Sequence, residues 1–404
     1  MWAICDQITV AAAGFATSVV VARAIGAAGL GRYAVSQSGA AMALTLVEAT
    51  VLTPYLVFYR SAGPAAAGRT SLRVFMAVIG PGLLLAVGVT ALGRVEGIGQ
   101  LVATAWLFAL TAVYQLAARS LVAAEAWGTL WVVDACGTVT QLLVLGLLWW
   151  LGLLTVPAAL LALGGVRLLV AALIWRVRPP VPGEARPAGE TLRARDYLFL
   201  GGWGTVSSAL GYLQRDFPVL ALARWTAPEV VSLFAAARQL LTPVQVALSG
   251  LQLWLVSGAA KHAVQSPRAL AAHINRFRRV VGLVGVAGLL VLAVAPGWVL
   301  GGVYGARFAQ GATTVRFLAP AVLLAALRGA AGTEMTVVLQ LVWPTVANAV
   351  SLASLAALIF LFASHLTSQT MAGCVLVAEV VFFIGVELCL HWSRSRRTGS
   401  GAPA

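Results

Sequence analysis

The amino-acid sequence predicts an all-α, polytopic membrane protein with about twelve transmembrane helices. Charged residues make up only 10% of the 404 residues, and the mean hydropathy is +0.92. In addition, nearly the whole chain consists of apolar runs of about 20 residues or more, the length that a helix needs to cross a bilayer. So few polar residues cannot cover a soluble domain, and any function must therefore reside in what crosses or lines the helical bundle.

The apolar runs form two groups of equal size. Short connections with glycine, proline or charged residues separate consecutive runs, because these residues end helices or require water. The first group is Ile4–Ile25, Tyr33–Phe58, Leu72–Leu92, Leu101–Ala124, Leu130–Leu151 and Val156–Trp175. The second group is Tyr197–Ala223, Val230–Ala259, Val280–Val303, Thr314–Leu341, Thr345–Ala363 and Thr370–His391.

Basic residues are distributed unevenly between the two sides of the predicted bundle. The formal net charge is +14, which in a soluble protein would suggest a nucleic-acid partner. With the N-terminus placed inside, seventeen basic residues fall on the cytoplasmic side and six on the outer side. Because cytoplasmic loops are enriched in Lys and Arg, this asymmetry predicts that both termini are cytoplasmic. It also explains the charge without a nucleic-acid partner.

A polar segment, RVRPPVPGEARPAGETLRARD, separates the two groups of runs. Its prolines favour an extended connector, and its charges keep it in water. We therefore expect an N-terminal lobe over 1–176, a cytoplasmic linker over 177–195, a C-terminal lobe over 196–392 and a cytoplasmic tail over 393–404. The segment VVAR at 20–23 also aligns with ALAR at 221–224. An even number of runs separates the two copies, which predicts two pseudo-symmetric, parallel six-helix lobes around a central cavity.

The second long cytoplasmic segment, 260–279, differs in kind from the linker. Ser266 and Pro267 are the residue types of a helix N-cap and first turn. Apolar residues then alternate with basic residues at helical spacing as far as Phe277. This pattern predicts an amphipathic helix that lies on the inner membrane surface.

Charged residues inside the runs are the main candidates for a functional site. Ionisable groups in a membrane are costly and usually face the bundle interior or a water-filled cavity. Arg215, Asp216 and Arg238 lie at similar depth on either side of one outer turn, so Asp216 is expected to pair with an arginine. Either this pair only locks two helices together, or three charges with one carboxylate form a cationic lining for an anion.

Two further arginines, Arg167 and Arg328, each lie near the middle of a run, and we expect them to line the cavity. Arg23 lies near the outer end of the first run, where it either lines the cavity or extends to the interface. Gln37 adds a hydrogen-bonding position, for substrate or between helices.

Buried acids either titrate in an ion-coupled cycle or serve as partners of buried arginines. The ion-coupling candidates are Asp134, Glu334, Glu379 and Glu48, and Asp6 lies at a depth similar to that of Glu48. The cysteines stand singly in apolar runs without the paired spacing of a metal site. The sequence therefore predicts neither a bound metal nor another cofactor.

Several motifs resemble those of bacterial polysaccharide exporters. VVVARAIGAAGLGRYAVSQS at 19–38 is similar to their first-hairpin signature, which follows a helix that often begins near Asp-Gln, here Asp6-Gln7. YLQRD at 212–216 and AAARQLL at 235–241 are similar to the start of their second half. VYGARFAQGATTVRFLAP at 303–320 is similar to the turn before their tenth helix. The chain thus resembles the lipid-linked oligosaccharide flippase (Wzx-like) branch of the multidrug/oligosaccharidyl-lipid/polysaccharide exporter superfamily.

This resemblance implies an alternating-access flippase, and not an enzyme. Its substrate would be an undecaprenyl-diphosphate-linked oligosaccharide, moved across the bacterial inner membrane for surface polysaccharide (such as lipopolysaccharide) biosynthesis. Membrane lipids, a polysaccharide polymerase and a chain-length regulator are the implied partners. Cavity arginines of such proteins bind the anionic headgroup, in agreement with a cationic lining.

Three alternative functions remain open at the level of the sequence, and one of them is a non-transporting scaffold that assembles polysaccharide enzymes. A multidrug antiporter of the same superfamily should favour carboxylate-lined sites for cationic drugs. A membrane polysaccharide polymerase or ligase needs a substantial outer loop, and the outer connections of this chain are short.

Overall fold

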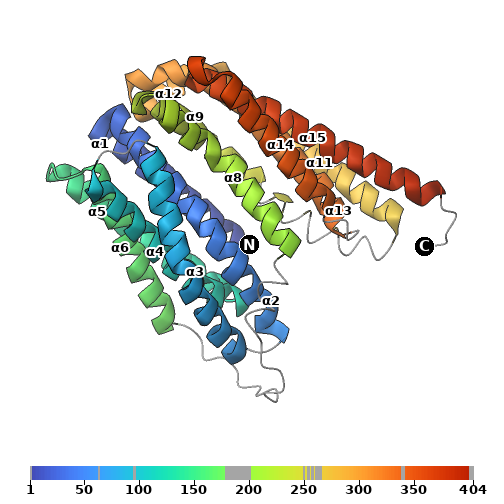
Figure 1. Cartoon of the computed structure of the whole chain (residues 1–404), viewed down its shortest axis with the longest axis horizontal. Coiled ribbons are helices and arrows are strands. Elements are labelled where there is room, and N and C mark those ends of the chain that lie inside the picture. Colours follow the sequence, from blue (N-terminus) through green and yellow to red (C-terminus); the bar gives the residue numbers. More distant parts are fainter. Residues whose placement is uncertain are drawn as a thin grey trace. The chain divides into compact units, whose positions relative to one another are not determined.

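A computed structural model describes residues 2–61, 64–93, 97–177, 202–248, 251–252, 255, 259, 266–337 and 342–399. Within these residues the secondary structure is helical, without strands, which confirms the predicted all-α fold class (Figure 1). The first half contains α1 (Trp2–Val47), the π-helical η1 (Glu48–Leu52), α2 (Thr53–Ser61), α3 (Pro64–Leu92), α4 (Ile98–Ala123), α5 (Trp127–Trp150) and α6 (Val156–Val177). There follow α8 (Gly202–Trp225), α9 (Pro228–Leu240), α11 (Pro267–Val294), α12 (Pro296–Tyr304), η2 (Ala306–Gly311), α13 (Ala312–Val337), α14 (Val342–Leu361), η3 (Ala363–His365) and α15 (Ser368–Gly399).

Every apolar run predicted to cross the membrane overlaps one or more of these helices. Eight helical segments of the described chain are long and apolar enough to span a bilayer. The first of them, Cys5–Leu56, covers two predicted runs, because α1 bends at Gly26, where φ is 81° and ψ is −174°. A residue with a side chain rarely adopts this backbone conformation, so glycine is suited to the turn between two consecutive helices. The chain is therefore a multi-pass membrane protein with about twelve helices.

The helices form two compact units, Met1–Ala235 and Ala236–Ala404. We call them unit 1 and unit 2 and describe each by itself. In unit 1, α8 packs against α1 and α3. The predicted linker over 177–195 falls almost entirely outside the described residues, so the lobe boundaries and the two-fold repeat remain predictions.

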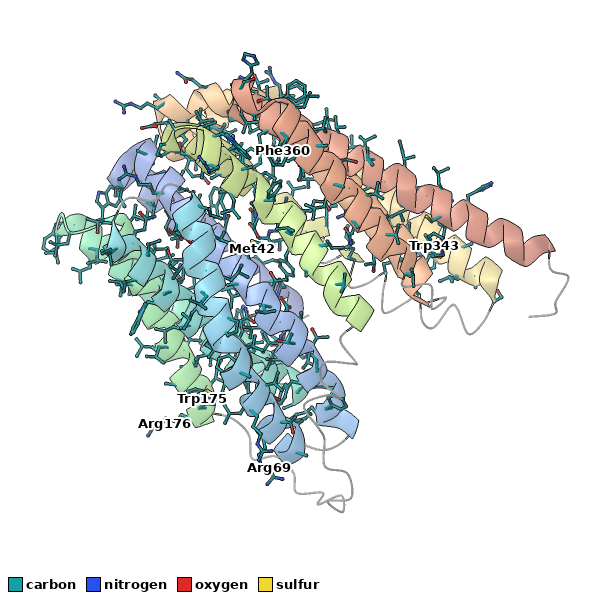
Figure 2. The ribbon with its side chains drawn as sticks, viewed as in Figure 1. Met42, Arg69, Trp175, Arg176, Trp343 and Phe360 are labelled. Atoms are coloured by element: carbon teal, nitrogen blue, oxygen red, sulfur yellow. The ribbon has the colours of Figure 1, made fainter. Side chains whose placement is uncertain are left out.

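Unit 1 is built around the long α1. This helix packs against α3, α4 and α5, and α6 packs along α4. The core of the α4–α5–α6 group includes Tyr114, Leu121, Val133, Val166 and Ile174. At one end of the unit, Figure 2 shows Arg69 of α3 together with Trp175 and Arg176 of α6. All three side chains lie at the same end of unit 1.

Unit 2 is built around α13, which packs against both α11 and α15, while α14 packs against α15. Two apolar clusters hold these helices together. One joins α11 to α13 and includes Phe277 and Ala330, and the other includes Ala347 of α14 and Phe382 of α15.

The structure corrects the prediction of a surface helix within 260–279. Ser266 caps the helix as expected, since its Oγ accepts a hydrogen bond from the N–H of Ala269 at 3.1 Å. The helix then continues without interruption to Val294, however, and Leu270, Ile274 and Phe277 are buried in the core of unit 2. An apolar face buried between helices cannot also lie in the membrane surface, so this prediction was wrong.

The exposed and buried side chains are distributed as in an integral membrane protein. Large apolar side chains are exposed around the helices, among them Trp150 at 81% and Leu84 at 78%. Charged side chains such as Asp6, Asp134 and Asp216 are buried instead, each below 5% exposed. In a bilayer the exposed surface must be apolar, because hydrocarbon offers no partners to polar groups.

Gly31 in α1 tests the packing of unit 1. A Cβ atom at this position would collide with the backbone carbonyl of Pro228, whereas a Cβ at Gly88 in α3 would meet nothing within 4 Å. Gly31→Ala should therefore lower the free energy of unfolding by about 1–3 kcal/mol through overpacking. Gly88→Ala should leave stability unchanged or slightly higher. Thermal unfolding in detergent measures both, and equal midpoints for the two variants would contradict the close approach.

Candidate functional site

An acidic cluster, formed by Asp6, Tyr114, Asp134 and Arg167, lies inside unit 1. The Tyr114 hydroxyl lies 2.8 and 2.7 Å from the two carboxylate oxygens of Asp134, close enough to donate a hydrogen bond to either. Asp134 lies on α5 and Tyr114 on α4, and both side chains are buried. Asp134 was predicted as an ion-coupling residue, and the structure places it in the interior of unit 1.

Asp6 of α1 is the second carboxylate of this cluster. Its side chain is buried and lies next to the Asp134 carboxyl, within electrostatic range of Arg167. Asp6 Oδ1 has no hydrogen-bond partner among the described residues. Two adjacent carboxylates repel each other unless they share a proton or a cation.

Arg167 of α6 completes the acidic cluster. Its guanidinium lies over the ring of Tyr114, with Cζ 4.6 Å from the ring centroid. Cation–π contacts of this kind hold a guanidinium in place without using its N–H groups. One arginine beside two aspartates leaves a formal negative charge, so the cluster is suited to take up a proton or a small cation.

Glu48 joins three helices of unit 1. Its Oε1 accepts a hydrogen bond from Arg119 Nη2 of α4 at 2.7 Å, and its Oε2 accepts one from the Tyr212 hydroxyl of α8 at 2.9 Å. Glu48 also begins the π-helical segment η1, a local widening that is frequent at functional positions. With both oxygens bonded, this predicted ion-coupling residue has the geometry of a structural ion pair.

Asp216 of α8 is buried and lies 3.4 Å from the hydroxyl of Ser38 in α1, within reach of a hydrogen bond from it. Arg215, the next residue, is exposed. Arg238 belongs to unit 2, so the predicted pair between Asp216 and an arginine stays a prediction. The remaining candidates of α1 are both exposed: Gln37 donates a hydrogen bond to the Tyr33 hydroxyl at 2.6 Å, and Arg23 lies before the bend.

A second charged cluster, formed by Arg328, Glu379 and Phe382, lies inside unit 2. Arg328 Nη1 of α13 lies 3.4 Å from Glu379 Oε2 of α15. The guanidinium also stacks on Phe382, with Cζ 3.9 Å from the ring centroid. Glu334, which lies further along α13, is buried, and only 8% of its surface is exposed. Two predicted site residues, Arg328 and Glu379, are thus in direct contact.

Sequence reasoning missed the neutral and peripheral partners of these charges. Tyr114 and Phe382 are aromatic residues inside apolar runs, where nothing in the sequence distinguishes them from core residues. Arg119 was not singled out as a site residue, although its guanidinium contacts Glu48. Only spacing offered a signal: Glu379 and Phe382 are three residues apart and therefore share a helix face.

No group of three or more His, Cys, Asp or Glu side chains suited to a metal ion occurs among the residues that the structure describes.

The fold was compared with known proteins. Protein-family models and curated protein sequences gave no match. Among solved structures, the lipid II flippase MurJ in an inward closed conformation superposes with a TM-score of 0.76 at 9% identity, over 96% of this chain and 87% of MurJ. An inward-facing multidrug resistance MATE family transporter of the MOP superfamily gives 0.74 at 11% identity, over 97% and 94%. The eukaryotic MATE transporter AtDTX14 gives 0.64 at 14% identity, over 98% and 95%. The chain therefore has the fold of these transporters over nearly its whole length.

Tyr114→Phe tests the acidic cluster. Removing the hydroxyl takes away a buried donor to Asp134, so the free energy of unfolding should fall by about 1–3 kcal/mol. Tyr59→Phe, a half-buried tyrosine of α2, serves as the matched control. Thermal unfolding of both variants in detergent is the measurement. An unchanged midpoint for Tyr114→Phe would show that Asp134 does not depend on this hydrogen bond.

Proposed function

We propose that this chain is an alternating-access flippase for an undecaprenyl-diphosphate-linked oligosaccharide in the bacterial inner membrane, with both termini in the cytoplasm. The observation that carries the proposal is Arg328 Nη1, a buried cationic nitrogen without a hydrogen-bond partner among the described residues. A guanidinium inside a membrane protein requires acceptors, and diphosphate oxygens suit it because they can accept two N–H bonds at once. The fold, shared with a protein named as a lipid II flippase, supports the same substrate class.

The proposed transport cycle divides the substrate between two environments. Arg328 holds the diphosphate in a setting of low dielectric constant, where charge attraction is stronger than in water. The polyprenyl tail remains in the bilayer, because its transfer into water would cost about 0.8 kcal/mol for each CH₂ group. The protein needs to shield only the sugar and the diphosphate. A polysaccharide polymerase and a chain-length regulator would receive the product.

A multidrug antiporter is the second candidate function, and the acidic cluster of unit 1 is compatible with it. Asp6 and Asp134 with a single nearby arginine form a site for a cation. The same cluster also serves a flippase that is driven by an ion gradient, so it distinguishes coupled from uncoupled transport and not one substrate from the other.

Replacing the candidate arginines tests the flippase proposal. Arg215→Ala, Arg238→Ala and Arg328→Ala should each reduce surface polysaccharide strongly, with unchanged abundance in the membrane. The Lys variants should recover only part of the activity, since an ammonium cannot reproduce the two-pronged guanidinium contact. Arg307→Ala, an exposed position in η2, is the control. Normal polymer in the triple Ala variant, at normal abundance, would remove the support for an anionic substrate.

Ion coupling is tested at Asp134 in proteoliposomes. Flipping of a fluorescent undecaprenyl-diphosphate oligosaccharide should accelerate in the wild type when a proton or sodium gradient is imposed. The Asp134→Asn variant should lose this response, because an amide neither binds a proton nor attracts a cation at neutral pH. Glu229→Gln, at an exposed acid of α9, should retain it. Gradient-driven efflux of a cationic dye, without flipping of the lipid, would favour the antiporter.

A further inference from the structure

The Arg328–Glu379 contact differs from two other ion pairs of the described chain. Arg119 Nη2 and Glu48 Oε1 are 2.7 Å apart, Arg278 Nη2 and Glu387 Oε1 are 2.5 Å apart, and both contacts are hydrogen bonds. Arg328 Nη1 and Glu379 Oε2 are 3.4 Å apart, and no hydrogen bond joins them. The contact is more deeply buried than the other two, with the side chains 24% and 12% exposed. Charge attraction without a hydrogen bond holds this pair.

Phe382 explains why the guanidinium does not turn toward Glu379 to form that bond. The ring is 4% exposed and packs in the core with Ala331 and Val386. The guanidinium stacks on it with Cζ 3.9 Å from the centroid, which fixes the guanidinium plane. Stacking uses the face of the guanidinium and leaves its N–H groups available. Arg328 is therefore fixed in orientation while Nη1 still lacks an acceptor.

We infer that Glu379 is a displaceable counterion of Arg328, which the anionic phosphate group of the substrate replaces during transport. This inference rests on the proposed function and adds a specificity-determining residue to it. A lone guanidinium in the bundle would be costly when no substrate is bound, and Glu379 lowers this cost. Because the contact lacks a hydrogen bond, no Arg328–Glu379 hydrogen bond is lost when phosphate replaces Glu379. The phosphate oxygens, in contrast, accept hydrogen bonds from the Arg328 guanidinium.

The counterion also limits how tightly the anion is held. A transporter must bind its substrate strongly enough to admit it and weakly enough to release it. Glu379 competes for the same cation, so it raises the dissociation constant and returns Arg328 to its resting contact after release. Removing the carboxylate should tighten binding and slow release. A purely structural ion pair has the opposite signature, since its loss would disturb the site and weaken binding.

The experiment compares Glu379→Gln with the wild-type full-length protein in nanodiscs. The probes are inorganic diphosphate and undecaprenyl diphosphate, with undecaprenol as the uncharged reference. The dissociation constants of both diphosphates should fall about tenfold in the variant, while undecaprenol binding is unchanged. The rise in melting temperature on adding diphosphate should also be larger in the variant than in the wild type. Flipping in proteoliposomes should slow down in step with the tighter binding.

Matched variants separate competition from general damage. Glu387→Gln removes the carboxylate of the hydrogen-bonded pair on the same helix and should leave both dissociation constants unchanged. Arg328→Ala combined with Glu379→Gln should bind as weakly as Arg328→Ala alone. If Glu379→Gln does not fold, Glu379→Asp keeps the charge on a shorter side chain, and binding should tighten by a smaller factor.

The outcomes are distinguishable. Binding that is unchanged or weaker in both Glu379 variants, with a normal wild type, overturns the counterion role and leaves the flippase proposal intact. Tightened binding of inorganic diphosphate, with no binding of undecaprenyl diphosphate, supports the counterion and overturns the lipid substrate. If neither diphosphate binds to the wild type or to the variants, both the inference and the flippase proposal fall.

Discussion

A charge placed in hydrocarbon must find its partner inside the protein, and this constraint governs both units. Many large side chains exposed around the helices are apolar, and the buried ionisable groups depend on partners from neighbouring helices. In unit 1 this need joins η1, α4 and α8 through Glu48, Arg119 and Tyr212. In unit 2 it joins α13 and α15 through Arg328 and Glu379. The polar contacts thus specify which apolar helices pack together, a choice that apolar side chains facing lipid leave open.

The sequence predicts the helices well because hydropathy is a local property. The run from Leu101 to Ala124, for example, corresponds to α4, Ile98–Ala123. Pairing between helices is not local and was predicted less well. Glu379 and Arg328 are distant in the chain, and no count of residues from a loop shows that they touch. The segment 260–279 illustrates the limit, because an amphipathic pattern shows which face is apolar but not what covers it. Here helix α13 covers that face, and not the membrane surface.

The contacts also change the interpretation of the buried arginines. Counted along the sequence, they exceed the nearby carboxylates, and this excess suggested a cationic lining. In the structure, Arg328 contacts Glu379, and Arg167 lies beside the Asp6–Asp134 pair. Neither charge is as isolated as its mid-run position suggests. What favours an anion at Arg328 is the missing hydrogen bond at Nη1, a property of geometry and not of composition.

The two units therefore differ in what they are suited to bind. The acidic cluster of unit 1 has more carboxylates than arginines and can take up a cation. The cluster of unit 2 contains an arginine whose single carboxylate partner is not hydrogen-bonded to it, and it can take up an anion. A transporter that moves an anion with the help of an ion gradient needs both properties, and they interfere least when they reside in separate bodies. On the proposed function, a cation bound to unit 1 and an anion bound to unit 2 are coupled when both ligands bias the same conformational equilibrium, which is the physical meaning of coupling between sites.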